Sequence, residues 1–549
     1  MKQRRWTAVR IVLILFLLIS VVLPILGVMT QITMEDAKKI ITSGQLGPMV
    51  IQTVAVTGIS TAISVTLAFI LAWCLNRTKI KGKGIFSVLF TIPMLIPSIS
   101  HGTGLVLLFG ENGIITNLLT MYLPGIKINL YGHFGMILGW VLYSFPVAFL
   151  MLNDSFQYED YTTYEAAQVL GLGKLEQFRT IMLPNMKKTL ISTIFATFTL
   201  IFTDYGVPLV VGGKVMTLSL YMYREVVGLL DFSKGAIIGI FLLIPAVAAF
   251  IIDLKNEDTA NTSTVTRPYN VTENRKRDML SYGICGLTVF VICLPIVAFA
   301  FLSVVKQYPI DFSFSLDHIR EAFVLGVGRY LENSLAIALG TSFIGVTVIY
   351  FTAYLTARSK RTWTTMTLHL ISMLSLAVPG IVLGLSYVLF FKSSFFYGTI
   401  VVLILVNTIH FFASPYLMAY NSLNKLNRNL EDVSDTLGIG RIRMVLDVYL
   451  PCTQKTIIEM FSYIFVNCMV TISAVSFLAN FKDMPLALLI PRFDSQSLVE
   501  ATAFIALVIL AVNGIMKLAI FILQRRMKDP EESYEETEIE KEREATNEY

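Results

Sequence analysis

Two short segments of this 549-residue chain carry the same residue types at the same spacing, 267 positions apart. The first reads Glu165-Ala166-Ala167-Gln-Val-Leu-Gly171-Leu-Gly173-Lys174 and is followed by Leu183-Pro184, and the second reads Asp432-Val-Ser-Asp-Thr-Leu-Gly438-Ile-Gly440-Arg441 and is followed by Leu450-Pro451. In both, the proline comes 13 positions after the first glycine. Each segment lies between long apolar stretches, so the pair predicts a membrane protein of two like halves, each presenting one polar loop to a soluble partner.

The sequence lacks the residues that nucleotide and metal chemistry need. It contains no GxxxxGK[ST] stretch, because neither Gly173-Lys174 nor Gly213-Lys214 is followed by Ser or Thr, so the chain cannot cradle ATP phosphates in the usual way. Its five cysteines form no CxxC pair, and no Cys/His cluster has the spacing of metal ligands. We therefore predict no catalytic residues, no metal site and no cofactor on this chain, and we expect that it is not an enzyme.

Composition places the chain in a membrane. Hydrophobic residues make up 55% and charged residues 15% of the sequence, which is typical of an integral membrane protein. A bilayer core about 30 Å thick requires about 20 apolar residues per helix. Counting such stretches predicts an all-α membrane protein with about twelve transmembrane helices. The predicted spans are 10–30, 49–75, 86–109, 131–152, 189–211, 235–253, 279–304, 333–357, 366–391, 398–422, 456–478 and 500–524.

Positive charge gathers on one side of these spans. Lys and Arg are frequent before the first span, after the second and eighth spans, in both repeated segments and after the last span. This excess predicts that both termini are cytoplasmic. The net charge of +5 therefore reflects orientation in the membrane, and we expect no nucleic-acid partner.

The internal repeat extends beyond the two segments. Residues 72–77 match 353–358, Pro97 to Gly102 matches Pro379 to Gly384, and Pro146 matches Pro415. We predict a first half at 1–255 with its loop at 159–188, a polar cytoplasmic linker at 256–278, a second half at 279–528 with its loop at 426–455, and an acidic cytoplasmic tail at 529–549. Six spans per half is an even number, so we expect parallel halves related by an axis along the membrane normal.

Local signals predict the shape of each loop. Thr162, three residues before Glu165, predicts a capping box at the start of a short helix, and Asn429 has the same place before Asp432. The two glycines that follow in each copy predict a left-handed turn at the end of that helix. A second helix is expected as far as the Leu-Pro pair. Each loop is thus predicted to be a short helix held by turns at both ends, which can transmit force between a soluble motor and the membrane helices.

The pattern resembles the EAA loop of permease subunits of binding-protein-dependent ABC importers of the type I, MetI-like group. The first copy matches it fully at Glu165, Ala166, Ala167, Gly171, Ile181, Leu183 and Pro184. The second copy keeps Gly438, Leu450 and Pro451, whereas Asp432, Val433, Ser434 and Val448 depart from it. The resemblance covers nearly the whole chain and implies a fused permease of two six-helix, MetI-like repeats.

The resemblance also implies partners. In that family the loop helix docks in a groove of an ATPase subunit, so both loops are expected to couple this chain to two copies of a separate ATPase, which bind ATP and Mg²⁺. An extracellular or periplasmic solute-binding protein is the third implied partner. The expected location is the inner or plasma membrane of a prokaryotic cell, within the lipid bilayer.

Two stretches bear on the solute. Fused permeases of this length resemble importers of iron(III), thiamine and 2-aminoethylphosphonate. The stretch 202–213, with Tyr221 and Val226 to Gly228, resembles the 2-aminoethylphosphonate branch, and 470–478 resembles both that branch and the iron branch. We therefore expect 2-aminoethylphosphonate as the solute, with iron(III) as the alternative.

A few polar residues within the apolar runs are candidates for the translocation pathway. They are Asp204, Tyr205, Asn407, His410, Asn467 and Ser473. A charged group such as Asp204 is costly at membrane depth and usually faces a cavity or a partner, but capping of the following turn at the outer mouth is an alternative. For the uncharged residues the alternative is hydrogen bonding between helices. Pro93, Pro97 and Pro379 predict kinks in the third and ninth spans.

Two other protein classes compete with an ABC permease. A twelve-helix secondary transporter also has parallel halves, but it needs buried ionisable residues for ion coupling, and only Asp204 and His410 qualify. It also gives no reason for matched loops that end in Leu-Pro. A membrane scaffold or sensor without transport predicts a sizeable soluble domain, and the sequence shows none.

Overall fold

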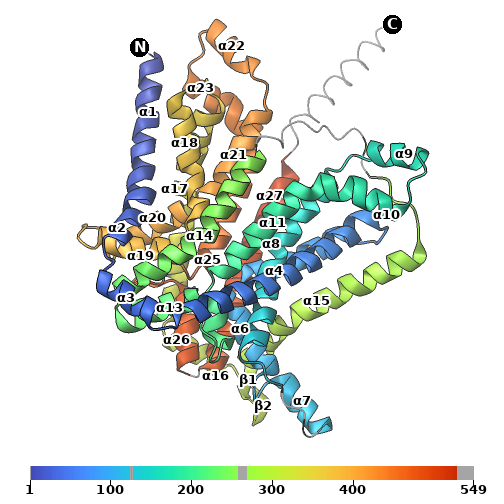
Figure 1. Ribbon diagram of the computed structural model, residues 1–549, viewed down its shortest axis with the longest axis vertical. Helices are drawn as coiled ribbons and strands as arrows, with labels where there is room; N and C mark the ends of the chain where they lie inside the picture. Colours follow the sequence, from blue (N-terminus) through green and yellow to red (C-terminus); the bar gives the residue numbers. More distant parts are fainter. Residues whose placement is uncertain are drawn as a thin grey trace.

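The computed structural model describes residues 2–123, 125, 128–257, 267, 269–308, 310–496 and 498–527. The predicted acidic tail and residues 258–266 and 268 of the predicted linker lie outside the described residues. The described chain forms helices and one antiparallel hairpin, in which β1 (Val305–Gln307) pairs with β2 (Asp311–Phe314). In Figure 1 the hairpin and α7 (Ile114–Tyr122) lie at the bottom, and the two repeated loops, around α9 (Thr162–Val169) and α22 (Asn429–Thr436), lie in the upper part.

The first half contains long helices where its apolar runs predict them, together with several short ones. Its other helices are α1 (Lys2–Leu17), α2 (Leu23–Met29), α3 (Met34–Thr42), α4 (Leu46–Arg77), α5 (Lys83–Thr91), α6 (Ser98–Phe109), α8 (His133–Gln157), α10 (Lys174–Gln177), α11 (Leu183–Phe202), α12 (Gly206–Val211), α13 (Leu218–Tyr223) and α14 (Phe232–Glu257).

The second half repeats this order after the linker. Its other helices are α15 (Arg275–Val304), α16 (Asp317–Val324), α17 (Val327–Ala357), α18 (Trp363–Met373), α19 (Gly380–Phe391), α20 (Ile400–His410), α21 (Ala413–Lys425), α23 (Arg441–Met444), α24 (Leu450–Cys452), α25 (Gln454–Val470), α26 (Leu489–Ser495) and α27 (Val499–Arg526).

The all-helical membrane architecture is confirmed, but fewer of the described helices qualify as spans than the twelve predicted. Within the described residues, eight helices are long and apolar enough to cross a membrane, or up to ten if two bent pairs each count as one span. The bent pairs are 363–377 with α19, at 107°, and α20 with α21, at 53°. The predicted spans 189–211 and 456–478 do not qualify, because α11 has the polar residues Asn185, Lys187 and Lys188 near its start and ends at Phe202, and α25 has only 17 residues.

Four helix breaks, two in each half, lie at corresponding positions of the two halves. A 3₁₀ turn, Ile92–Leu95, separates α5 from α6, and another, Leu374–Ala377, separates α18 from α19, where the sequence places Pro97 and Pro379. Proline lacks the N–H that a continuous helix needs, so the chain turns there. The other pair follows α11 and α25, at 203–205 and from Thr471 onward.

The first helices of the two halves exchange places. Helices α1 and α2 pack against α18 and α19 of the second half, whereas α15 packs against α4, α5 and α6 of the first half as well as against α27 of its own half. Figure 1 shows α1 beside α18 on one side and α15 below α4 on the other. Each half is therefore completed by a helix of the other.

Candidate functional site

Each loop helix ends in the same left-handed turn. Gly171 has φ +75° and Gly438 has φ +67°. The N–H of Leu172 donates to the Ala167 carbonyl at 3.0 Å and that of Gly171 to the Gln168 carbonyl at 3.0 Å. In the second loop Ile439 donates to Ser434 at 2.9 Å and Gly438 to Asp435 at 3.3 Å. Both turns are Schellman motifs, so the prediction for the first glycine of each copy is confirmed.

The second glycines and the predicted caps differ from expectation. Gly173 and Gly440 are extended, with φ −67° and −73°, and each precedes the next short helix rather than forming a left-handed turn. Thr162 and Asn429 lie inside α9 and α22, and their side chains do not cap these helices. Instead, the N–H of Thr162 donates to Asp160 Oδ1 at 3.0 Å and that of Asn429 to Asn427 Oδ1 at 2.9 Å. The capping acceptors therefore precede the helices by two residues.

The two loop helices bury and expose the same positions. Ala167 and its counterpart Ser434 are buried, which explains a small side chain there. Leu170 and its counterpart Leu437 are 78% and 67% exposed, and Leu175 and Ile442 are exposed as well. Glu165 and Asp432 lie on the outer surface of their helices with Ala166 and Val433. Each loop thus presents an apolar tip with an acidic residue one turn before it.

In the first loop the Leu183-Pro184 pair does not end a helix, contrary to the prediction, but lies within one, whereas in the second loop Leu450-Pro451 belongs to α24, which ends at Cys452, and Thr453 separates it from α25. Matched π-helical turns, Phe178–Met182 and Val445–Tyr449, precede Leu183 and Leu450 directly. Because a proline four residues on has no N–H, the carbonyls of Thr180 and Asp447 lose their α-helical donors, and the wider π turn accommodates this. Helix α10 therefore continues through its π turn into α11, which reaches toward the centre of the molecule.

A buried ion pair holds the first loop against α4. Arg77, the last residue of α4, pairs with Glu159, and their side chains are only 4% and 3% exposed. Tyr164 of α9 donates its hydroxyl proton to the same carboxylate. Burial and the hydrogen bond to Glu159 raise the pKa of Tyr164, so the hydroxyl stays a donor.

The second loop is held by an equivalent arginine–glutamate–tyrosine cluster, in which the glutamate comes from a different position of the repeat. Arg358, directly after α17, binds Glu431 through Nε and Nη2, both at 2.6 Å, and Tyr449 donates to Glu431 Oε1 at 2.7 Å. Arg358 also donates to the Leu426 carbonyl at 2.9 Å. The sequence repeat aligns the two arginines, but not the acids, because Glu159 lies six residues before Glu165 whereas Glu431 lies one before Asp432. Sequence comparison of the halves therefore missed both pairs.

Asp204 lies in the break between α11 and α12. Its carboxylate accepts hydrogen bonds from Trp140 Nε1 at 2.9 Å and from the N–H groups of Gly206 and Val207 at 3.2 and 3.0 Å. These contacts come from its own half and close the turn that starts α12. This geometry agrees with capping of the following turn, which was the alternative to a role of Asp204 in the translocation pathway.

Tyr205 joins the two halves at the centre. Its hydroxyl contacts Ser476 Oγ and lies 3.4 Å from the Ile472 carbonyl, both in the break after α25. Its ring stacks on Tyr223, with centroids 4.3 Å apart and planes at 11°. The break of one half thus contacts the break of the other.

His410 and Ser473 meet at Gly380, the first residue of α19. A β-carbon on Gly380 would lie 2.5 Å from Ser473 Oγ and 2.9 Å from His410 Nε2. The first half has the same close approach with the residue types exchanged, since a β-carbon on Gly206 would lie 2.5 Å from Ser98 Oγ. Sequence analysis named His410 and Ser473 separately but not their proximity.

The two asparagines differ in their surroundings. Asn407 is buried one turn before His410, and neither its amide nitrogen nor its oxygen has a hydrogen-bond partner among the described residues. Asn467 donates to the Tyr463 carbonyl, one turn earlier in α25, at 2.8 Å. Asn407 therefore faces the same side of α20 as His410, whereas Asn467 is satisfied within its own helix.

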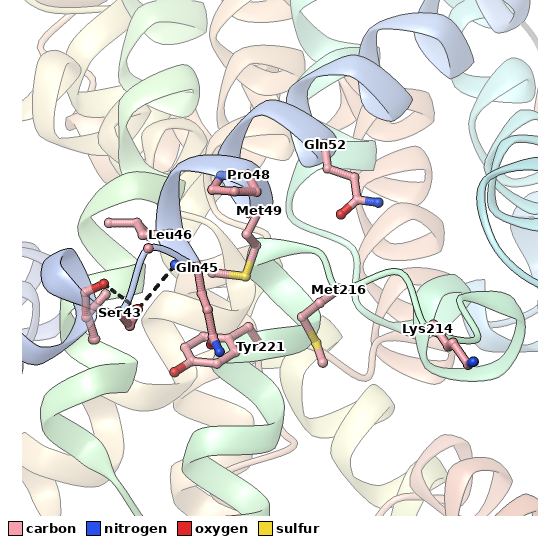
Figure 2. A pocket seen from close by; sticks show the side chains of 11 residues that line it. Ser43, Gln45, Leu46, Pro48, Met49, Gln52, Lys214, Met216 and Tyr221 are labelled. Atoms are coloured by element: carbon pink, nitrogen blue, oxygen red, sulfur yellow. Dashed lines mark hydrogen bonds between the residues drawn. The ribbon is translucent and has the colours of Figure 1, made fainter.

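A cavity of about 380 Å³ lies at the start of α4, far from the loops. Figure 2 shows its lining side chains, with Gln45, Met49 and Tyr221 toward one end and Lys214 at the other. Helix α4 spans about 48 Å at 1.5 Å per residue, so its two ends place this cavity and the Arg77 anchor on opposite faces. The lining offers amide, hydroxyl and ammonium groups for hydrogen bonding.

Comparison with known proteins identifies the class of the chain. Residues 64–254 and 349–529 match the family described as binding-protein-dependent transport system inner membrane component. A ferric transport system permease protein of Actinobacillus pleuropneumoniae is 24% identical over 77% of this chain and 62% of its own length. An Fe(3+)-transport system permease protein of Haemophilus influenzae is 22% identical over 84% of this chain and 86% of its own. A thiamine transport system permease protein of Brucella abortus is 25% identical over 30% of the chain.

The two family matches together cover more than half of the chain, one in each predicted half. They agree with the two loops, buried anchors and central breaks that the structure repeats. This is a multi-pass, non-catalytic membrane component without a bound cofactor, and the chain belongs to the inner membrane components of binding-protein-dependent transport systems.

Proposed function

We propose that the chain is the fused permease of an ABC importer, in which each loop docks on one copy of an ATPase subunit. The supporting observation is the duplicated loop: two Schellman turns, two exposed apolar tips and two anchored arginines in one chain. In this arrangement both termini and the linker are cytoplasmic. A solute-binding protein delivers solute to the opposite face.

The helical segments that lead from each loop toward the centre provide the route for force; they are continuous in the first half and turn at Thr453 in the second. Closure of the two ATPase subunits on ATP displaces both loops. In the first half, α10, the π turn and α11 carry the displacement to the break at 203–205, where Tyr205 contacts the second half. The two halves then rock about this central contact and open the path outward, and hydrolysis returns them.

The path itself is proposed to run beside the central breaks. Tyr205, His410 and Ser473 supply hydroxyl and imidazole groups there, and Asn407 supplies an amide whose hydrogen-bonding capacity is unused among the described residues. Asn467 is a more peripheral candidate. Asp204 acts in this proposal by holding the break around which these groups are arranged.

We propose iron(III) as the solute, in place of the 2-aminoethylphosphonate expected from the sequence. Two relatives that align with most of this chain are named for ferric transport. Hydroxyl groups such as those at the centre suit a hard cation or its oxygen-rich chelate.

Reconstitution tests both parts of this proposal. The permease is placed in liposomes with an ATPase subunit and a solute-binding protein from the same organism, and uptake of radiolabelled iron(III) and of 2-aminoethylphosphonate is measured with and without ATP. ATP-dependent iron uptake is the expected result. Uptake of the phosphonate alone would overturn the solute, and uptake driven by an ion gradient without any ATPase would overturn the class.

A further inference from the structure

The described part of the linker lies directly on the first loop. The N–H of Tyr161 donates to the Arg267 carbonyl at 3.0 Å, and the N–H of Arg267 lies 3.4 Å from Asp160 Oδ1. Two residues later, the ring of Tyr269 packs edge-on against Tyr161 and Tyr164, with centroids 5.0 and 5.1 Å apart. The linker backbone and one of its aromatic side chains are thus both fixed to the start of the loop helix.

The same tyrosine covers the charge that anchors the loop. The guanidinium carbon of Arg77 lies 3.7 Å from the centre of the Tyr269 ring, on the side chain that also pairs with Glu159. A cation over an aromatic face is attracted to it, more strongly when water is excluded. Tyr269 therefore fixes the position of Arg267 with respect to α9.

Arg267 in turn reaches the signature acid. Its Nη1 lies 3.3 and 3.5 Å from the two oxygens of Glu165, and the side chains are 66% and 43% exposed. An ion pair this exposed contributes little to stability, so stability does not account for its placement. Glu165 and Val169 are four residues apart on α9 and share a face, and Val169 is among the most exposed apolar residues of the chain. Arg267 thus lies on the same face of α9 as the exposed Val169, which directly precedes Leu170 of the apolar tip.

The second loop has a different neighbour. Asp432 takes the place of Glu165, and no ion pair to it occurs in the described part of the chain. At the second loop the N-terminal helix contributes instead, since the guanidinium of Arg441 lies 5.9 Å from the ring centre of Trp6. The two loops are alike in backbone and tip, but among the described residues only the first loop has an added cation paired with its acid.

We propose that Arg267 of the linker belongs to the surface of the first loop that contacts the ATPase, so that the two ATPase-docking sites of this chain are not equivalent. The inference rests on the proposed docking of ATPase subunits on both loops. Its partner is the ATPase subunit at the first loop, and it predicts an acidic or hydrogen-bond-accepting group there, opposite Arg267.

Site-specific photo-crosslinking in the assembled complex tests this contact. A photoreactive amino acid is placed at position 267, at Leu170 and Leu437 on the two tips, and at Tyr122, which lies at the far end of the molecule. Crosslinks to the ATPase from 170, 437 and 267, but not from 122, are expected. Crosslinks from 170 and 437 without one from 267 would overturn this inference and leave the docking proposal intact, and the absence of all three would overturn the docking proposal itself.

Charge variants of Arg267 distinguish a contact with the ATPase from a role limited to the ion pair with Glu165. Arg267→Ala is expected to weaken ATPase association about three- to tenfold, as loss of a charged rim contact does, whereas Arg275→Ala, at the exposed first residue of α15, leaves it unchanged. The exchanged pair Glu165→Arg with Arg267→Glu keeps the internal ion pair but reverses the charges that the ATPase meets, so it is expected to stay defective. Full recovery in the exchanged pair, or wild-type association of Arg267→Ala, would overturn the inference.

Discussion

A β-carbon added at Gly171 or Gly438 meets no atom within 4 Å, so only the left-handed backbone opposes a side chain there. That conformation costs an L-residue about 1–2 kcal/mol. Gly171→Ala is therefore expected to loosen the turn and to lower transport-coupled ATP hydrolysis, while the amount of protein in the membrane stays the same. Hydrolysis by the reconstituted complex with and without loaded binding protein measures this.

Gly173→Ala is the matched control for that variant. Gly173 has an extended backbone, and its added β-carbon would lie 3.7 Å from Glu176 Oε2, an ordinary contact. It is expected to behave as wild type. Equal activity of the two variants would show that the left-handed turn plays no part in coupling.

The Arg77–Glu159 pair predicts a large effect on stability. Arg77→Met leaves the buried Glu159 carboxylate without its cation, and breaking a buried pair in this way costs about 3–5 kcal/mol. The double variant Arg77→Met with Glu159→Gln removes the isolated charge and is expected to recover much of the loss. Thermal unfolding of the purified protein measures both variants.

An exposed pair gives the comparison. Lys79 Nζ lies 3.2 Å from Glu273 on the surface of the same region, so Lys79→Met is expected to change stability by less than about 1 kcal/mol. If Arg77→Met were as stable as Lys79→Met, the pair would not hold the loop.

At the residue scale the sequence predicted the turns but not the anchors. Glycine at a helix end has one dominant reason to be there, so Gly171 and Gly438 could be interpreted directly. An arginine and a glutamate far apart in sequence carry no such signal, and Glu159 and Glu431 occupy different positions relative to the repeat. His410 and Ser473 could be named as polar residues in apolar runs, but only the fold brings both to Gly380.

Among the elements, the π turns before the Leu-Pro pairs set the rotation of each loop relative to the helix that follows. A π turn accommodates one extra residue, which corresponds to about 100° of helix rotation. Pro184→Ala restores an N–H, so the turn can return to a regular α-helix and rotate the loop. We expect more ATP hydrolysed per solute transported, with unchanged protein amount.

Pro48→Ala provides the control at the far face. Pro48 lies in the first turn of α4, where the N–H has no helical acceptor, so its replacement is expected to leave coupling unchanged. An unchanged ratio of hydrolysis to transport in Pro184→Ala would mean that the π turn does not set the coupling geometry.

The helix breaks limited the prediction of spans for a simple physical reason. Apolar runs such as 189–211 continue through the break at 203–205, and hydrophobicity reports burial rather than backbone direction. Where proline marks the break, as at Pro97 and Pro379, the kink was predictable. Where a residue such as Asp204 closes it through tertiary hydrogen bonds, it was not.

For the whole molecule, the exchange of first helices predicts how the halves assemble. Residues 1–262 and 263–549 expressed as separate chains are expected to purify together, because α1 and α2 lie on the second half and α15 lies on the first. Omitting residues 1–30 from the first chain removes one side of this exchange and is expected to reduce recovery of the pair. Separate chains that purify apart with or without residues 1–30 would contradict the exchange. The apolar runs in the sequence predicted these helices, but they carry no information on which neighbouring helices bury them.

The exchanged serine and glycine at the central breaks restrict how the two halves can diverge. Ser98 faces Gly206 in one half, and Gly380 faces Ser473 in the other. Grafting the segment around Ser473 into the position of Gly206 would set two hydroxymethyl groups in a space that holds one, and the reciprocal graft would leave a void. Substitutions at these sites must therefore occur in pairs within a half, and any chimaera built from homologous permeases has to carry both members of a pair across the same crossover.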